Sequence, residues 1–383
     1  MEEFIRNQGR ILLAGDLFPT EENVALFADG DVERLFGSDL CRLFAGADLA
    51  VCNMEGSLTD RPGTCRKTGP VKVAPCRAVE AYKRLGIQVC LLANNHVTDG
   101  GTEGVLDTLL SLEDAGIRAI GAGMDADSIA HSFVQTVAGM RIGFYNVAET
   151  MYNRPGKETP GVWLYDEWLV CREIEALKRQ CDFLVVAYHG GIEKYPYPSP
   201  ETRKRFHRMA ESGADLVIAQ HTHCIGAEEM YKGARLMYGQ GDFLLKNYLP
   251  GKTDTGLVLE LRIDKGNVSL VRHLVRSVEH RFVRYDDHQD LLPWDALSAR
   301  LDDDAFLAGE FRRFCDRELD LYLTAFKSPP VWARLLRRIS RRAYRNWLRK
   351  NAFRSDDLLF ALHTLRSEQN RETAVTGLEQ LLK

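Results

Sequence analysis

Histidine, carboxylate and amide side chains follow five short apolar runs of this chain. The clearest case is Leu216–Ala219, a strand-like run that leads directly to His221 and His223. In an extended segment the side chains at i and i+2 point the same way, so both imidazoles are expected to face one point. Two such nitrogens can hold a divalent metal ion, although the same pair also suits a polar surface loop.

Four more apolar runs end in the same kinds of residue. Asp16 follows Ile11–Ala14, Asn53 and Glu55 follow Leu49–Cys52, Asn94, Asn95, His96 and Asp99 follow Val89–Ala93, and His189 and Glu193 follow Phe183–Tyr188. In an open α/β sheet, ligands collect beyond the carboxyl ends of the strands. We therefore expect these groups to share one crevice.

These donor groups favour one kind of chemistry. Carboxylate and amide oxygens with imidazole nitrogens suit one or two ions of Mn, Fe, Zn or Mg. No thiolate is needed, so we interpret Cys224 as incidental. A carboxylate can bridge two ions about 3.5–4 Å apart, an arrangement that supports phosphoester hydrolysis. His96 could then protonate the leaving oxygen.

Each of these residues also has a purely structural interpretation. Asp16 and Asn53 could cap turns after their strands, and the segment 94–96 could cap a helix ahead of Gly100. Glu193 could be a solvated loop carboxylate. The common position of the groups after strands favours the functional interpretation.

Strands and helices alternate along the first three quarters of the chain. The strand-like runs, which also include 118–120 and 142–147, are separated by helical patterns at 31–44, 78–85, 104–115, 168–179 and 200–212. This alternation predicts an α/β fold with a parallel or mixed sheet, and Asp264–Asn267 marks a closing hairpin. Helical patterns alone follow, at 296–301, 304–326, 331–351, 356–366 and 372–382. We predict a main domain over 1–284, a connection at 284–292 and a helical domain over 293–383.

Composition limits the class of protein. The 383 residues carry a net charge of −4 and 45% hydrophobic residues, which is typical of a globular protein and argues against a nucleic-acid partner. Nine scattered cysteines without a Cys-x-x-Cys pair favour a reducing compartment, so we expect a cytoplasmic location. Residues 1–10 lack the pattern of a signal peptide, and no apolar run is expected to span a membrane.

In order and spacing, the motifs of residues 10–275 resemble those of the CapA family. These are bacterial capsule and poly-γ-glutamate biosynthesis proteins, similar to calcineurin-like metallophosphoesterases. The matching motifs are Gly15-Asp16, Asn53-x-Glu55, Asn94-Asn95-His96-x-x-Asp99-x-Gly101, His189-x-Gly191-x-Glu193, His221-x-His223 and Gly239-x-Gly241-Asp242-Phe243.

The resemblance implies a fold and a set of roles. The fold would be a metallophosphatase-like four-layer αββα sandwich, of α/β (α+β) class, and His96 would be the catalytic acid. The implied metal ligands are Asp16, Glu55, Asn95, His189, His221 and His223. The residues expected to support them or to face the substrate are Asn53, Asn94, Asp99, Glu193 and Asp242.

Some positions depart from the family pattern. Phe18 stands where the usual Asp-x-His opening has its histidine, which removes one expected ligand. Gln220 and Thr222 replace residues of the usual Gly-His-His-Pro-His motif, although the paired histidines remain. Asp242 stands where asparagine is usual.

The C-terminal quarter contains a basic segment. Ten cations and no acidic residue lie between Asp320 and Asp356, and apolar residues recur at near-helical spacing over 331–348. The pattern predicts a basic amphipathic helix over 329–350 that opens at Pro329-Pro330. Such a helix could lie peripherally on an anionic membrane, hold an acidic polymer, dock on the main domain, or be a packed helix with a solvated basic face.

Three functions follow from these features and stay open here. The first is a metal-dependent phosphoesterase-type hydrolase of capsule or surface-polymer synthesis, with a phosphoester or acidic-polymer substrate. The second is a non-catalytic or weakly catalytic factor that binds an acidic polymer such as polyglutamate. The third is an enzyme that forms or cleaves amide bonds in that polymer.

Overall fold

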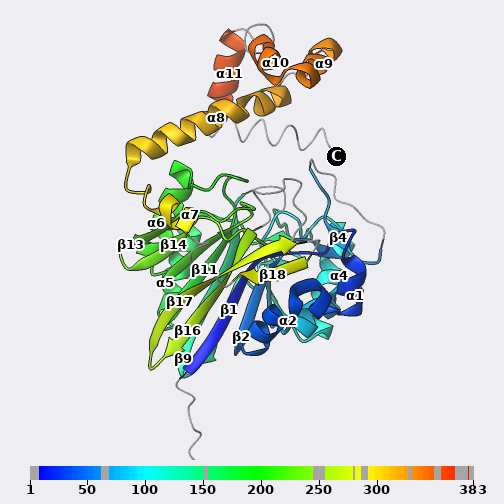
Figure 1. Cartoon of the computed structure of the whole chain (residues 1–383), viewed down its shortest axis with the longest axis vertical. Helices are drawn as coiled ribbons and strands as arrows, with labels where there is room; N and C mark the ends of the chain where they lie inside the picture. Colours follow the sequence, from blue (N-terminus) through cyan, green and yellow to red (C-terminus); the bar gives the residue numbers. More distant parts are fainter. Residues whose placement is uncertain are drawn as a thin grey trace, which may run out of the picture. The chain divides into compact units, whose positions relative to one another are not determined.

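The structure is a computed structural model of the whole chain (Figure 1). It describes residues 8–61, 69–150, 154–244, 255–278, 281–285, 292–326, 330–348, 355–366 and 378. These residues form two compact units, Met1–Asp302 and Asp303–Lys383. Each unit is described by itself below.

The first sheet of the larger unit is mixed. Its strands run in the order β18 (Arg281–Tyr285), β17 (Asn267–Val278), β16 (Thr255–Asp264), β1 (Gln8–Leu17), β2 (Leu49–Met54), β5 (Val89–Leu91) and β6 (Arg118–Ile120), and β15 (Asp242–Leu244) also pairs with β1. The strands β1, β2, β5 and β6 are mutually parallel, whereas β16 to β18 are antiparallel. The turn between β16 and β17 is the hairpin expected at Asp264–Asn267.

The second sheet has six strands. Their order is β13 (Glu228–Tyr231), β14 (Ala234–Met237), β12 (Leu216–Gln220), β11 (Phe183–His189), β9 (Met140–Ala148) and β8 (Ser132–Val137). The central strands β14, β12, β11 and β9 are parallel, and the edge strands β13 and β8 are antiparallel to their neighbours. The sequence did not indicate β8, β13 or β14, because the edge strands β8 and β13 are partly exposed and β14 has only four residues, so none of them shows a long apolar run.

The two sheets pack face to face. Alternate residues of β1, such as Ile11 and Leu13, form a shared core with Phe144 of β9 and Val185 of β11. Because side chains alternate along a strand, the intervening residues of β1, such as Leu12, face the opposite side of the sheet and pack against helices. A fully buried aliphatic side chain contributes about 1.5–3 kcal/mol, so both layers stabilise the unit.

Helices cover the outer face of each sheet. On the first sheet lie α1 (Val24–Asp29), α2 (Val32–Ala45), α3 (Val79–Leu85) and α4 (Gly101–Asp114), and on the second lie α5 (Glu167–Lys178) and α6 (Pro200–Glu211). Asp31, Asp166 and Ser199 accept hydrogen bonds from main-chain N–H groups in the first turns of α2, α5 and α6. The order helix, sheet, sheet, helix confirms the four-layer αββα sandwich and the α/β class.

Short elements complete the larger unit. They are β3 (Ser57–Leu58), β4 (Val73–Ala74), a 3-10 turn at Cys76–Ala78, β7 (Ala122–Gly123), β10 (Gly161–Val162) and α7 (Leu292–Ser298). The side chain of Ser298 accepts a hydrogen bond from the main-chain N–H of Glu228, 2.9 Å away, which ties α7 to β13. The boundary between the two units thus falls after Asp302 in the sequence, whereas the connection was expected at 284–292.

The smaller unit is helical in its described residues. It contains α8 (Asp304–Phe326), α9 (Val331–Ile339), α10 (Arg341–Trp347) and α11 (Ser355–Arg366), and the helix expected over 372–382 lies outside the described residues. The prediction of a single basic helix over 331–351 was wrong. Ser340 is extended (φ −152°, ψ 110°) and its side chain caps α10, so the segment forms two helices. No helix within the described ranges is both long and apolar enough to cross a bilayer.

Candidate metal centre

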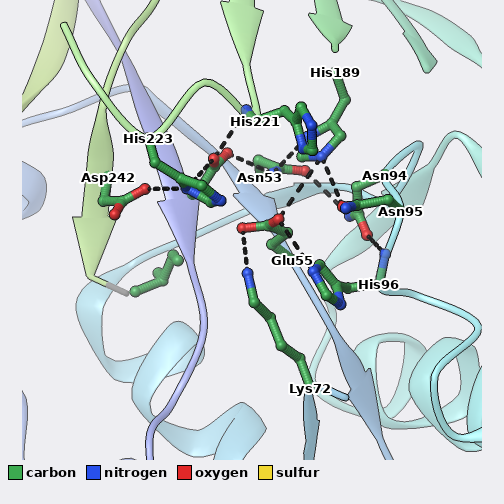
Figure 2. Close-up of polar contacts among 12 residues, drawn as sticks. Asn53, Glu55, Lys72, Asn94, Asn95, His96, His189, His221, His223 and Asp242 are labelled. Atoms are coloured by element: carbon green, nitrogen blue, oxygen red, sulfur yellow. Dashed lines mark hydrogen bonds and ion pairs between the residues drawn. The ribbon is translucent and has the colours of Figure 1, made fainter. Parts of the chain in front are cut away.

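The expected residues meet where the carboxyl ends of the two sheets come together (Figure 2). In the first sheet Asp16 lies in register with Asn53 of β2 and Asp242 of β15. In the second sheet His189 ends β11 beside Gln220, the last residue of β12. The amide of Asn53 links the sheets, because Nδ2 donates to Oδ1 of Asp16 at 2.7 Å and to Nδ1 of His189 at 3.2 Å.

His221 and His223 reach the centre from a tight turn, not from an extended segment. Both have left-handed backbone conformations, with φ of 83° and 52°. The extended geometry expected from their i and i+2 spacing was therefore wrong, although both imidazoles do reach the same centre. Left-handed conformations are unfavourable for a side chain with a Cβ and persist where surrounding contacts impose them.

Two carboxylates hold this turn. The main-chain N–H of His221 donates to Oδ2 of Asp16 at 3.0 Å. Nδ1 of His223 is 2.7 Å from Oδ1 of Asp242 and 3.7 Å from Oδ2 of Asp16. Donor atoms of Asp16, His223 and Asp242 lie within 4.8 Å of one another, so Asp242 belongs to one of the two candidate ligand groups.

Glu55 lies at the middle of the second group. One donor atom each from Glu55, His221 and His223 again lie within 4.8 Å. Oε1 of Glu55 is 3.8 Å from Nε2 of His189, and the same nitrogen is 3.0 Å from Oδ1 of Asn95. All six expected ligands thus surround one small volume.

The donor set fits a divalent cation. Oε1 of Glu55 and Nδ1 of His221 are buried and have no hydrogen-bond partner among the described residues. Buried polar atoms are normally hydrogen-bonded, and unsatisfied ones are costly, so these atoms call for a ligand. Oxygen and imidazole donors match the preferences of Mn, Fe, Zn and Mg.

The pKa shifts of Asp16 and His221 agree with this interpretation. Burial, followed by the charge of Glu55, raises the pKa of Asp16 to about 7. Burial, followed by the charge of His223, lowers the pKa of His221 to about 3, which leaves a neutral imidazole with a lone pair. A bound cation would relieve the crowding of carboxylates and use that lone pair.

His96 is oriented from behind by Asp99. Nδ1 of His96 is 2.7 Å from Oδ2 of Asp99, and because a carboxylate accepts, Nδ1 carries the proton. Nε2 of His96 then faces Oε1 of Glu55 at 3.8 Å. Oδ1 of Asn94 accepts from the main-chain N–H groups of His96 and Val97, so Asn94 shapes this turn.

One expected residue lies apart from the centre, and one residue of the centre was not predicted from the sequence. Glu193 is exposed on the turn after β11. Among the described residues, no hydrogen bond or ion pair joins it to the centre. Lys72, which the sequence did not single out, has its Nζ 2.8 Å from Oε2 of Glu55. A lone lysine before a two-residue strand carries no spacing signal.

Two further features complete the surroundings. A shallow pocket beside the centre is lined by Asn94, Asn95, Ala148, Glu149, Val162, Leu164 and His189. Burial raises the pKa of the Cys224 thiol to about 12. A protonated thiol is a poor metal ligand, which agrees with an incidental role for Cys224.

A family of known proteins shares this sequence pattern. The model of the bacterial capsule synthesis protein family PGA_cap matches residues 10–247. The chain belongs to this family. All the candidate ligands lie within the region that the PGA_cap model matches.

The curated relatives of this chain are distant in sequence. Over 198 residues the chain is 28% identical to the capsule biosynthesis protein CapA of Bacillus anthracis, covering 50% of this chain and 48% of that protein. Over 214 residues it is 30% identical to a probable polyglutamine synthesis accessory protein of Mycobacterium tuberculosis, covering 51% and 55%. The chain thus spans about half the length of these relatives. A solved structure, the 5'-nucleotidase precursor of Thermus thermophilus, matches with 15% identity and a TM-score of 0.45 over 82% of this chain and 60% of that one.

Proposed function

We propose that this protein is a metal-dependent phosphoesterase-type hydrolase that serves the synthesis of a bacterial capsule or a related surface polymer. The observation that carries the proposal is the convergence of Glu55, His189, His221 and His223 beside His96. The names of the relatives, which refer to capsule and polyglutamine synthesis, supply the biological setting.

The donor set would hold one or two divalent ions of Mn, Fe, Zn or Mg. Asp16, Glu55, Asn95, His189, His221 and His223 would be the ligands, with Asp242 available as a further oxygen donor. When bound, a divalent ion supplies an activated water and stabilises negative charge on a phosphoryl oxygen. Asn53 and Asn94 fix the ligand-bearing segments, because their amides bridge Asp16, His189 and the turn at His96.

His96 would act on the leaving group. Its Nδ1 is fixed on Asp99, so Nε2 is the nitrogen that can give a proton to the leaving oxygen. Burial lowers the pKa of His96, and the hydrogen bond with Asp99 partly offsets this shift. An anionic phosphoester beside Nε2 would favour the protonated imidazole and so prepare it as an acid.

The decisive measurement is release of phosphate from an aryl phosphate. Protein freed of metal by chelation and then reloaded with Mn or Fe should release phosphate, and renewed chelation should abolish the release. His223→Ala should fail to regain activity under the same conditions. Absence of metal-dependent release, with retained binding of polyglutamate, would favour the alternative of a factor that binds an acidic polymer. Cleavage or formation of polyglutamate without phosphate release would favour the amide chemistry.

A second proposal concerns location. We propose a cytoplasmic protein that contacts an anionic membrane peripherally through residues 329–350. Val331, Trp332, Leu335 and Ile339 of α9 are exposed, with Ile339 83% exposed. Five exposed arginines accompany them on α9 and α10, namely Arg334, Arg337, Arg338, Arg341 and Arg342. Apolar side chains beside arginines suit the interface of an anionic bilayer.

Vesicle binding tests this second proposal. Full-length protein should sediment with vesicles that contain anionic phosphatidylglycerol and not with phosphatidylcholine alone. Replacing Trp332 and Ile339 by serine should weaken the binding, and so should raised salt, since exposed charges are screened. Replacing Trp168, an exposed tryptophan of α5 at 68% exposure, by serine is the matched control and should change nothing. Equal binding by all variants would refute contact through α9.

A further inference from the structure

Main-chain hydrogen bonds hold Lys72 in place next to the centre. Its main-chain carbonyl accepts from the N–H of Ser57 at 3.0 Å, and its main-chain N–H donates to Oδ2 of Asp99 at 2.7 Å. The same Asp99 oxygen contacts Nδ1 of His96. The backbone of Lys72 is therefore fixed by the groups that also position His96 and the strand β3.

The side chain of Lys72 extends into the centre (Figure 2). It is 15% exposed, and its ammonium forms an ion pair with Oε2 of Glu55, whose side chain is fully buried. The other oxygen of Glu55, Oε1, faces Nε2 of His96 and Nε2 of His189 at 3.8 Å. One oxygen of Glu55 thus faces the imidazoles, and the other faces a fixed cation.

The different partners of the two Glu55 oxygens affect how many metal ions the centre can bind. A carboxylate that bridges two ions offers one oxygen to each of them. The ammonium of Lys72 already takes one oxygen of Glu55, and a divalent ion at the same oxygen would be repelled by that ammonium at short range and low dielectric. Apart from this ion pair, the ammonium has no hydrogen bond among the described residues, so N–H donors remain for an anionic ligand.

We propose that Lys72 fills the position of a second cation, so that the centre binds one divalent ion per chain. The ammonium and the single ion would together supply the positive charge that faces an anionic substrate. The substrate class in this statement rests on the proposed function, but the number of bound ions does not.

The number of ions bound per chain tests the inference directly. Full-length protein and its variants are freed of metal, incubated with excess Mn, passed through a desalting column and analysed for Mn per chain. We expect one ion in the wild type, one in Lys72→Arg, which keeps the charge, and two in Lys72→Met, which removes it. Lys178→Met is the matched control and should bind one ion, since Lys178 pairs with Asp215, which precedes β12 at the end of the strand opposite the centre.

The ion counts of the wild type and of Lys72→Met decide the inference. Two ions in the wild type, or one ion in folded Lys72→Met, would overturn the inference. If circular dichroism shows that Lys72→Met is unfolded, Lys72→Gln carries the same expectation of two ions, and the count in the wild type still decides. Failure of every form to release phosphate, with the expected counts, would instead refute the proposed hydrolase and leave the role of Lys72 standing.

Discussion

At the scale of single residues, the centre depends on side chains held in demanding positions. His221 and His223 have left-handed backbones, a conformation that costs of order 1–3 kcal/mol at each residue. Asp16 and Asp242 hold this turn through hydrogen bonds of 3.0 and 2.7 Å. Strain concentrated at two candidate ligands, and held by two more, is what a site pre-organised for a ligand requires.

The first prediction concerns these imidazoles. His221→Ala and His223→Ala should each weaken Mn binding by more than the roughly 10–100-fold typical of losing a group that only supports a ligand. Cys224→Ser should leave it unchanged, because the protonated thiol is no ligand. Isothermal titration with Mn measures all three. A loss of binding in Cys224→Ser equal to that in His223→Ala would return the thiol to the ligand set.

The second prediction concerns His96. His96→Asn should retain Mn binding and the fold, since the described ligand groups do not include His96, while turnover of an aryl phosphate falls by roughly 10²–10⁴. His207→Asn, which changes a histidine that pairs with Glu229 outside the centre, is the control and should keep full turnover. Loss of metal in His96→Asn would make His96 a ligand, and full activity would limit it to a structural role.

At the scale of elements, a buried carboxylate joins three strands of the first sheet. Glu260 of β16 is fully buried and contacts Nε of Arg10 on β1 at 2.6 Å and Nε2 of His273 on β17 at 2.7 Å. Arg262 adds a third contact at 3.0 Å. Burial alone would raise the pKa of Glu260, but these three partners lower it from 4.5 to about 2.

The third prediction is the effect of pH on this junction. Because the folded protein has the lower pKa, the ionised carboxylate contributes stability above about pH 4.5, and this contribution is lost as the pH falls from 4.5 towards 2. The shift corresponds to at most about 3 kcal/mol, and the partial exposure of Arg10 and Arg262 to solvent reduces this to about 1–2 kcal/mol.

Chemical denaturation at several pH values measures this contribution. Glu260→Gln should unfold more easily than the wild type at pH 7, and the difference should shrink as the pH approaches 2. Glu175→Gln on α5, where the glutamate is exposed, is the matched control and should follow the wild type. A constant difference between Glu260→Gln and the wild type across the pH range would show that packing, not ionisation, causes the loss.

At the scale of the whole molecule, the candidate site and the basic helices belong to different units. Every candidate ligand lies before Asp302, whereas α9 and α10 follow Asp303. The larger unit has its own core between the two sheets. Chemistry and location can therefore be tested separately.

The fourth prediction follows from this division. A chain that ends at Asp302 should fold, bind Mn as the full chain does, and release phosphate from a small aryl phosphate, while it loses binding to anionic vesicles. Metal analysis, turnover and vesicle sedimentation measure the three properties. A soluble but inactive truncated chain would place a residue of the smaller unit in the reaction, and an insoluble one would show that the apolar residues of that unit are needed to cover the larger one.

The sequence by itself determined most of the buried local elements of this protein and indicated its candidate metal ligands. Buried parallel strands are continuous apolar runs, so β2, β11 and β12 could be predicted within one or two residues. A residue directly after such a strand must lie at the carboxyl edge of the sheet, and this rule placed Asp16, Glu55 and His189 in one crevice. Family resemblance added the individual roles, which remain predictions.

Only the tertiary structure decided how distant segments meet. Lys72 reaches Glu55 because β4 pairs with β3 and Asp99 holds its backbone, contacts that no local pattern encodes. The turn at His221 needs Asp16, which lies 205 positions away in the chain. The basic segment keeps an almost helical period across Ser340, yet a hydroxyl cap breaks it into two helices. Periodicity reports which residues are buried, whereas these outcomes depend on specific hydrogen bonds and ion pairs formed after the elements pack.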